Sequence, residues 1–441
     1  MSNNIVQVNV TQTIAPAPST LQRTGALLSM GGTTEAAGST TLLTQLADLT
    51  AILRPSASIA TLAWSGGTVT ATTSAPHGLT TSDVLSIVIA GATPVAYNGV
   101  FECTITGAST FTYALVSNPG SNTLPGTYNL ASASELLAMG TTFFAQGTGA
   151  SVYVLELGKV PVADAVAALA TFIIDNTPQI FYSYLVPRAW ADEADYLTFL
   201  ASFESTTAKT YFFTTMTNAN YTDFTELMKD VFGLIEAPAV TTTLPAVEFS
   251  CAAPFYHWLN NDPSTTNKVA PFAFRYLFGV TAYPIRGNSA LFAVWKAAGV
   301  NWVGTGAEGG ISNTVLLWGT TMDGRDATYW YSVDWAQINL DLDLSNEIIN
   351  GSNNPINPLY YNQEGINRLQ ARAQGTMNRG ISYGLVLSPV VVNAVPFVPY
   401  VAENESDYII GKYAGLSVSY TPARGFTQIV FNVNVTDFPT A

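Results

Sequence analysis

Both ends of the chain alternate between apolar and polar residues. Near the N-terminus the apolar positions are Val6, Val8 and Val10. Near the C-terminus the apolar positions are Ile429, Phe431, Val433 and Val435. A period of two is typical of a β-strand with one apolar face. The pattern predicts a strand-like arm at each end, and such an arm can join the sheet of its own domain.

The next periodic segment, residues 41–53, repeats its leucines at intervals of three and four. This spacing places Leu42, Leu46, Leu49 and Leu53 on one face of a helix. The Arg-Pro pair that follows would end the helix. We therefore expect one helix over this segment.

The composition and pattern of the sequence change at residue 56. Up to residue 129 the chain is rich in Thr, Ser and Gly, and short alternating runs are separated by Gly-Gly, Asn-Gly and Pro-Gly turn signals. Such a succession predicts a small all-β module. No Lys or Arg occurs between Pro55 and Gly158. We interpret residues 56–129 as an all-β module inserted into a larger domain.

Strand-like and helical patterns alternate in the stretch after the module. The strand-like runs are SVYVLEL, QIFYSYLV and TYFFTT, and helical patterns separate them. This alternation is typical of an α/β layer with a largely parallel sheet. Residues 21–55 and 130–310 are therefore assigned to an α/β body.

From residue 311 the pattern becomes mixed, and we expect an α+β domain over residues 311–425 with a helix near residues 363–377. Asp341 and Asp343 alternate with leucines, which favours an extended segment with one wet face. The uncharged stretch from Ile381 to Ala402 contains three prolines, so we expect buried strands and turns there and no membrane insertion. The predicted fold class is α/β plus α+β in a multidomain chain.

Composition favours a surface that neighbouring molecules cover. The chain has 441 residues, 16 basic and 30 acidic, with a net charge of −14 and a pI near 4.4. An acidic protein of this kind is not expected to bind the phosphates of nucleic acid. Only 10% of the residues are charged, whereas a soluble domain usually has about 25%. A surface so short of charge suits burial against further copies of the chain.

The cysteines and the N-terminus indicate where the protein is made. Cys103 and Cys251 lie far apart, and neither has a His or Cys neighbour at metal-ligand spacing, so no disulfide framework and no zinc site is predicted. The first 18 residues contain neither a basic residue nor a continuous apolar stretch. We therefore expect no secretory signal and a protein that stays in a cytosol.

Most side chains with catalytic potential have a simpler structural interpretation. Gly304, Gly306 and Gly309 form a GxGxxG string, but it leads into a strand and not into the helix that a dinucleotide site requires, so a loop is favoured. The histidines and acid pairs are His77, His257, Asp192/Asp195, Asp323/Asp326 and Asp341/Asp343. The acid pairs leave glycosidase chemistry open, but no nucleophile signature accompanies the histidines. We predict no catalytic residue, no cofactor and no metal.

The densest basic cluster comprises Arg368, Arg372 and Arg379. The first two are four residues apart and share one face of the predicted helix, and no acid lies among the three. Two interpretations stay open, namely a solvated helix face and a surface that contacts an acidic partner.

In the order of its parts the chain resembles the contractile tail sheath proteins of bacteriophages. The stretches that carry the resemblance are LLTQLADLTAIL, NTVLLWGTT, DGRDATYWYSVDWAQINLDL, INRLQARAQGTMNRGIS and FTQIVFNVNVTDFP. The stretch from Pro76 to Leu115 is similar to a β module that is grafted onto many phage structural proteins. The resemblance covers nearly the whole chain, although the Asn-rich segment after Ile349 is longer than expected.

The resemblance implies a non-enzymatic tail sheath subunit that stacks as hexameric rings around the tail tube and contracts to drive the tube through the host envelope. Residues 1–20 and 426–441 would be arms that exchange strands between neighbours. The C-terminal domain would face the tube, which makes the three arginines candidate tube contacts.

The partners implied are further copies of the chain, the tail tube protein, and baseplate and tail terminator proteins, without cofactor or nucleic acid. The location implied is the phage virion, after assembly in the host cytoplasm. The alternatives are another phage tail or baseplate structural protein and an enzyme on the α/β body.

Overall fold

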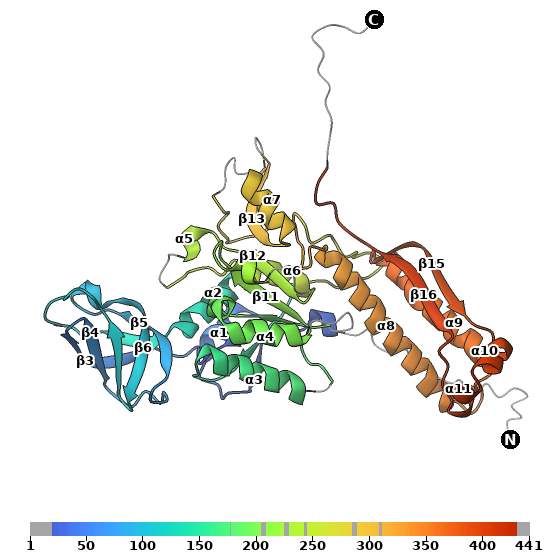
Figure 1. Ribbon diagram of the computed structural model, residues 1–441, viewed down its shortest axis with the longest axis horizontal. Helices are drawn as coiled ribbons and strands as arrows, with labels where there is room; N and C mark the ends of the chain where they lie inside the picture. The colour runs from blue at the N-terminus through green and yellow to red at the C-terminus, as the bar shows by residue number, and fades with distance from the viewer. Residues whose placement is uncertain are drawn as a thin grey trace, which may run out of the picture. The chain divides into compact units, whose positions relative to one another are not determined.

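The computed structural model describes residues 20–176, 178–203, 209–224, 229–241, 245–284, 289–307 and 311–429 (Figure 1). The chain divides into two compact units. The larger unit, here called the body, comprises Leu21–Asn261, Pro271–Trp330 and residues 424–429. The second unit comprises chiefly Asp262–Ala270 and Tyr331–Ala423.

An eight-stranded sheet forms the centre of the body, with the strand order β14-β13-β12-β11-β10-β1-β9-β2. The six central strands run parallel, and the edge strands β2 and β14 are antiparallel to their neighbours. The strands are β1 (Gly25–Ser29), β2 (Thr40–Leu43), β9 (Val152–Glu156), β10 (Ser183–Leu185), β11 (Tyr211–Met216), β12 (Val231–Ile235), β13 (Asn301–Ala307) and β14 (Ile311–Leu317).

Helices cover both faces of this sheet. Phe212 and Phe213 are adjacent on β11 and point to opposite faces, where the first ring packs on Phe199 of α4 and the second on Phe255 of α6. Strands buried on both faces need continuous apolar runs, which explains the aromatic-rich sequences. The predicted α/β body with a largely parallel sheet is confirmed. Its helices are α1 (Leu46–Ile52), α2 (Ala131–Ala145), α3 (Val162–Asp175), α4 (Ala194–Phe203), α5 (Pro238–Thr241), α6 (Ala252–Leu259) and α7 (Ser289–Ala297), with 3-10 turns at Leu21–Arg23, Val95–Tyr97, Arg188–Asp192 and Tyr221–Phe224.

The Thr/Ser/Gly-rich segment forms a closed antiparallel barrel with the strand order β3-β4-β7-β6-β5-β8. Its core is separate from that of the body and is built around Val69, Ile87 and Phe111. The prediction of a small all-β module is therefore confirmed. The strands are β3 (Ala57–Ser65), β4 (Thr68–Thr73), β5 (Val84–Ala90), β6 (Gly99–Gly107), β7 (Thr110–Ala114) and β8 (Thr127–Leu130).

The second unit combines two long helices with a two-stranded sheet. The division between the units falls within α8, after Trp330. Strands β15 and β16 pair antiparallel, and α9 packs against β15. The elements are α8 (Ala327–Ser352), α9 (Gln363–Ser382), β15 (Val386–Ala394), α10 (Phe397–Glu403), α11 (Glu405–Ile409) and β16 (Leu416–Pro422).

Two segments adopt a different secondary structure from the one expected. Residues 41–53 are divided between β2 and α1, because Leu43 is buried and pairs with Val152 at the edge of the sheet. Asp343 lies in α8 and not in an extended segment. Tyr331 and Trp335 are buried at a spacing of four, so the helical period overrides the local alternation of leucines around Asp343.

The boundary expected at residue 311 also differs from the structure. Residues 311–317 form β14, which joins β13 and belongs to the body. Gly304 lies within β13, where it pairs with Val315 and its missing side chain leaves room for Leu317. The GxGxxG string therefore begins in a strand of an antiparallel pair and not in the expected loop, and Gly309 lies outside the described residues.

The stretch from Ile381 to Ala402 was expected to consist of buried strands and turns. The structure gives it strand β15 and most of helix α10, so the strand is confirmed and the helix is new. The expected burial is wrong for most of the strand, because only Val386 and Val392 of β15 are buried. Of the helices that the structure describes, none is both long and apolar enough to cross a membrane.

Candidate assembly surfaces

The two-stranded sheet of the second unit has open outer edges. Within the described part of the chain, β15 and β16 pair only with each other. Val392 faces Val418 across the pair, and the register shifts between Leu387 and Val391. A strand edge presents a row of N–H and C=O groups with which a further strand can pair. Each outer edge is therefore a place where one more strand can add.

Helix α9 covers one face of this sheet and fixes its position. Val386 and Val392 of β15 are buried. Gly380 of α9 permits the close approach, because a Cβ at this position would lie 2.9 Å from the Trp335 ring and 3.0 Å from Val386 Cγ2. A sheet that is already held in place loses little freedom when another strand binds, which favours binding.

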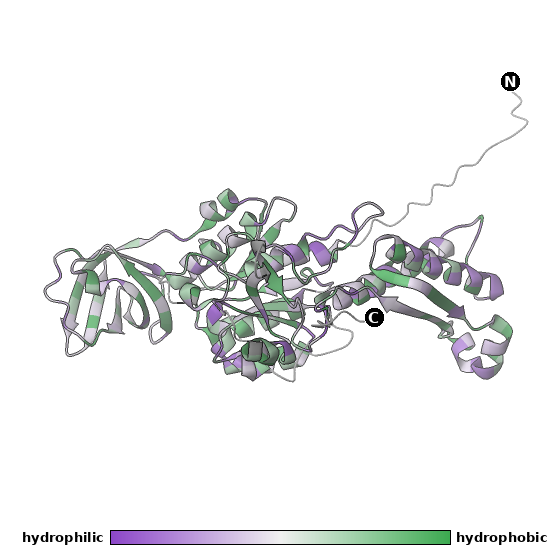
Figure 2. Ribbon diagram, turned by 90° about the horizontal axis from the view of Figure 1, so that it is seen from above, coloured by the Kyte–Doolittle hydropathy of each residue, from purple (hydrophilic) through white to green (hydrophobic). Residues whose placement is uncertain are grey.

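The opposite face of the sheet is open and partly apolar. Leu387 and Val391 on β15 are 51% and 49% exposed. Their cross-strand partners are the exposed polar residues Thr421 and Ser419. Figure 2 shows apolar residues interspersed with polar ones along this part of the chain. The open face offers apolar contacts next to the open edges, as expected for a surface that another chain covers.

A cluster of tyrosines closes the connection between β15 and β16. Tyr400 Oη donates to Asp407 Oδ2 at 2.8 Å, and Tyr413 Oη donates to the Val395 carbonyl at 2.6 Å. The hydrogen bond from Tyr400 lowers the pKa of the Asp407 carboxyl. The Tyr400 and Tyr413 rings are 4.7 Å apart. These contacts hold the end of the sheet in one arrangement.

The three candidate arginines lie on α9 and form ion pairs with α8. Arg368 Nη2 lies 2.6 Å from Glu347 Oε1, and Arg372 Nη2 lies 2.8 Å from Asp343 Oδ1. Arg379 pairs with the other oxygen of Asp343. Asp343 is only 3% exposed, whereas the arginine side chains are 24%, 29% and 40% exposed in sequence order. The arginines therefore join the two helices and still present part of their surface to the outside.

The acids in this network were not identified from the sequence. Asp343 was assigned to an extended segment, and Glu347 was not singled out. A signal was present, because Asp343 and Glu347 are four residues apart, as are Arg368 and Arg372. Two helices whose charges repeat at the same interval can pair along their length.

Most residues of the expected arms lie outside the described residues. These are Val6, Val8, Val10, Phe431, Val433 and Val435. Ile429 is the last described residue, and its side chain is 78% exposed. The assignment of these residues to subunit interfaces stays a prediction.

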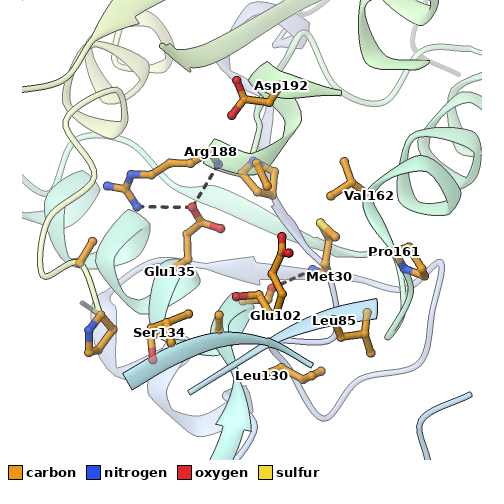
Figure 3. Close-up of a pocket in the computed structure, with 18 of the residues that line it drawn as sticks. Met30, Leu85, Glu102, Leu130, Ser134, Glu135, Pro161, Val162, Arg188 and Asp192 are labelled. Carbon is orange, nitrogen blue, oxygen red and sulfur yellow. Dashed lines mark hydrogen bonds and ion pairs between the residues drawn. The ribbon is translucent and has the colours of Figure 1, made fainter. Parts of the chain in front are cut away.

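A cavity of about 440 Å³ lies in the body, between the barrel strands β5 and β6 and the carboxyl ends of parallel strands (Figure 3). Doubly wound sheets commonly bind ligands at this edge. Arg188 borders the cavity, and its guanidinium contacts Glu236 at 2.7 Å, Glu135 at 3.4 Å and the Glu248 carbonyl at 2.7 Å. Burial raises the pKa of Glu135, although Arg188 opposes the shift. These groups satisfy one another, which favours a structural role.

The other sequence candidates are also engaged in local structure. Asp192 accepts a hydrogen bond from Asn220 at 2.9 Å, and Asp195 lies in the first turn of α4. His257 Nε2 lies 3.0 Å from the Tyr276 carbonyl. Burial and the nearby Arg275 lower the pKa of His257 to about 4.

His77 accepts a hydrogen bond from the Leu79 amide at 3.1 Å through Nδ1. Cys103 and Cys251 are buried free thiols. Among the residues that the structure describes, no group of three or more His, Cys, Asp or Glu side chains is arranged to hold a metal ion.

No protein-family model and no curated protein matches the chain, whereas several solved structures share its fold. A chain of the six-fold symmetrised baseplate of the anti-feeding prophage (AFP) is 13% identical, with a TM-score of 0.59 and 99% of both chains covered. A chain of the AFP helical sheath in the contracted state is 13% identical, with a TM-score of 0.55 and the same coverage. A chain of the contracted AFP baseplate is 12% identical, with a TM-score of 0.52, and 99% of this chain and 98% of that chain are covered. The chain therefore shares its fold with these AFP chains along nearly its whole length.

Proposed function

We propose that this chain is a non-enzymatic sheath subunit of a contractile injection apparatus. Copies would stack as hexameric rings around a tube, and contraction of the stack would drive the tube through a target envelope. The observation that carries the proposal is the common fold with a chain of the AFP helical sheath over 99% of both chains. The low charge of the chain agrees with a surface that further copies cover.

The two-stranded sheet supplies a physical basis for linking the copies. The arms at residues 1–20 and 426–441 would add to the open edges of β15 and β16 in neighbouring subunits. About six main-chain hydrogen bonds per arm would contribute about 3 to 9 kcal/mol before any apolar burial. An extended segment of about 15 residues spans about 50 Å, enough to cross to an adjacent subunit. Arms of this kind would keep neighbouring subunits connected while the subunits move as rigid bodies.

The partly exposed arginines of α9 are the proposed contacts with the tube. Arg368, Arg372 and Arg379 carry three positive charges, and Asp343 and Glu347 balance two of them. The remaining charge would attract an acidic tube surface. Exposed charge pairs contribute up to about 1 kcal/mol each and weaken with salt, so many of them hold a sheath that can still release its tube.

Further partners proposed for the assembled stack are baseplate and terminator proteins at its two ends. The particle would be a phage tail or a related injection device that assembles in the cytoplasm of the producing cell. A baseplate subunit is the second candidate, because a chain of the AFP baseplate shares the fold with a TM-score of 0.59.

Electron microscopy of the purified full-length protein tests the proposal. A sheath subunit forms long hollow tubes with six-fold symmetry, whose length grows with protein concentration. Closed rings that do not stack would favour the baseplate candidate. Protein that stays monomeric at every concentration and salt condition would contradict both.

A further inference from the structure

The first residues of the C-terminal arm are bound to the body. Strand β16 ends at Pro422, and the Ala423 amide still donates to the Leu385 carbonyl within the second unit. Residues 424–429 contact residues of the body instead. The described part of this segment ends at Ile429.

One carboxylate holds both this segment and the start of a helix. Asp326 directly precedes α8, and its Oδ1 accepts the Thr328 amide at 2.8 Å, as an N-cap residue does. Its Oδ2 accepts the Gly425 amide at 2.7 Å. A hydrogen bond to a charged acceptor is stronger than a neutral one. The main chain of the arm is therefore attached to the N-terminus of α8.

Two cationic side chains, those of Arg424 and Lys296, hold the segment on either side of the Gly425 hydrogen bond. The guanidinium of Arg424 lies 4.6 Å from the centre of the Tyr329 ring. Lys296 Nζ donates to Gln428 Oε1 at 2.8 Å and also lies 4.2 Å from the Trp318 ring. Cations over aromatic faces and hydrogen bonds of this kind each add a modest attraction.

Gly425 also approaches the body too closely for any side chain. A Cβ on Gly425 would lie 2.6 Å from Pro271 Cβ, a distance that such atoms do not adopt without a shift. The neighbouring Phe426 is 80% exposed. The backbone is thus seated on the body while the apolar side chain points away from it.

We propose that residues 424–428 form an arm anchor, in which Asp326 is the positioning residue. The anchor fixes the point and direction from which the C-terminal arm leaves the subunit. The arm then starts from the body, so a force that a neighbouring copy exerts on the arm is transmitted to the body and to the start of α8. The role in assembly rests on the proposed sheath function, whereas the attachment itself is a property of the single chain.

Limited trypsin digestion of the unassembled full-length protein tests the attachment. Cleavage after Arg424 releases residues 425–441 as one peptide, because this peptide contains no Lys or Arg. Mass spectrometry measures its release relative to cleavage after Lys412, a residue of the second unit whose side chain is exposed. Trypsin can cut after Arg424 only when this peptide bond moves away from the body. The rate at which the peptide is released therefore reports how often the anchor opens.

Two variants open the anchor by different means. Asp326→Asn retains one oxygen to cap α8 but presents an amide N–H₂ group where Gly425 needs an acceptor. Gly425→Ala places a methyl group against Pro271. The matched control is Gly375→Ala, because a Cβ at Gly375 of α9 meets nothing within 4 Å. We expect both anchor variants to release the peptide about tenfold faster than wild type, and the control to release it at the wild-type rate.

The outcomes separate the anchor from the sheath function. Equal release rates in wild type and both anchor variants would overturn the anchor. Faster release at an unchanged melting temperature, together with loss of tubes, supports both the anchor and its positioning role. Faster release with normal tubes would overturn the positioning role. If the wild-type protein forms no tubes and both anchor variants still release the peptide faster, the anchor is supported and only the sheath function is contradicted.

Discussion

Asp343 shows how a single buried carboxylate links two helices. It accepts hydrogen bonds from Arg372 and from Thr376 Oγ1, the latter at 2.6 Å, and it pairs with Arg379 as well. A buried charge is stable only when it is paired and hydrogen-bonded. The arginines are partly solvated, so they can still act on another molecule while they satisfy Asp343.

Replacing Asp343 should therefore destabilise the second unit. We expect Asp343→Asn to lower its free energy of unfolding by about 1 to 3 kcal/mol, because two arginines lose their acceptor charge. Urea denaturation followed by circular dichroism measures the change. Asp341→Asn is the matched control, since Asp341 is exposed on the same helix, and it should change stability by less than about 0.5 kcal/mol. Equal effects of the two substitutions would show that the network adds nothing.

At the scale of elements, the contact between α9 and β15 holds the two-stranded sheet in the position from which it would bind the proposed further strand. Gly380 lies in this contact, and Gly375 of the same helix lies outside it. Gly380→Ala should destabilise the second unit by about 1 to 3 kcal/mol through overpacking against Trp335 and Val386. Gly375→Ala should instead stabilise it by about 0.5 to 1 kcal/mol, because alanine favours helix. Thermal unfolding of the two variants measures both, and a stabilising Gly380→Ala would contradict the close packing.

The proposed contact of α9 with the tube needs a test that leaves the helix pair intact. A charge reversal at Arg368 would place two acids together, because Arg368 pairs with Glu347. The double variant Arg368→Gln with Glu347→Gln removes both charges and keeps a neutral hydrogen bond possible. We expect it to form sheath tubes but to co-assemble several-fold less with purified tube protein at low salt.

Glu347→Gln alone is the control for this test, and it should co-assemble at least as well as wild type because it removes only the neutralising acid. Co-sedimentation at low and high salt measures the bound fraction. Normal co-assembly of the double variant at low salt would leave Arg368 with a structural role alone.

At the scale of the whole molecule, local patterns were sufficient for the barrel and the parallel sheet but not for α8. Turn signals and the strand-helix alternation depend on neighbouring residues, which the sequence displays directly. The burial of Asp343 depends on arginines about 30 positions later in the chain. A local alternation of leucines and acids therefore suggested a strand. The role of Asp326 was equally hidden, since Gly425 lies 99 positions away.

The barrel should be dispensable both for the folding of the body and for the formation of tubes. It has its own core, and its two connections lie together, since Asn129 Nδ2 donates to the Arg54 carbonyl at 2.8 Å. Replacing residues 56–129 with a short Gly/Ser linker should leave a folded protein that still forms tubes. Loss of tubes with an intact body, seen by electron microscopy and circular dichroism, would show instead that the barrel is part of the lattice.

A cryo-EM reconstruction of the assembled protein tests the sheath function and the linkage between copies together. We predict that the sheet of β15 and β16 gains strands at its outer edges, contributed by the N-terminal and C-terminal arms of neighbouring copies, in a six-fold helical tube. Protein lacking residues 1–15 should stay folded and soluble without forming such tubes. A reconstruction in which the sheet stays two-stranded, or tubes formed by the truncated protein, would contradict strand exchange as the link between subunits.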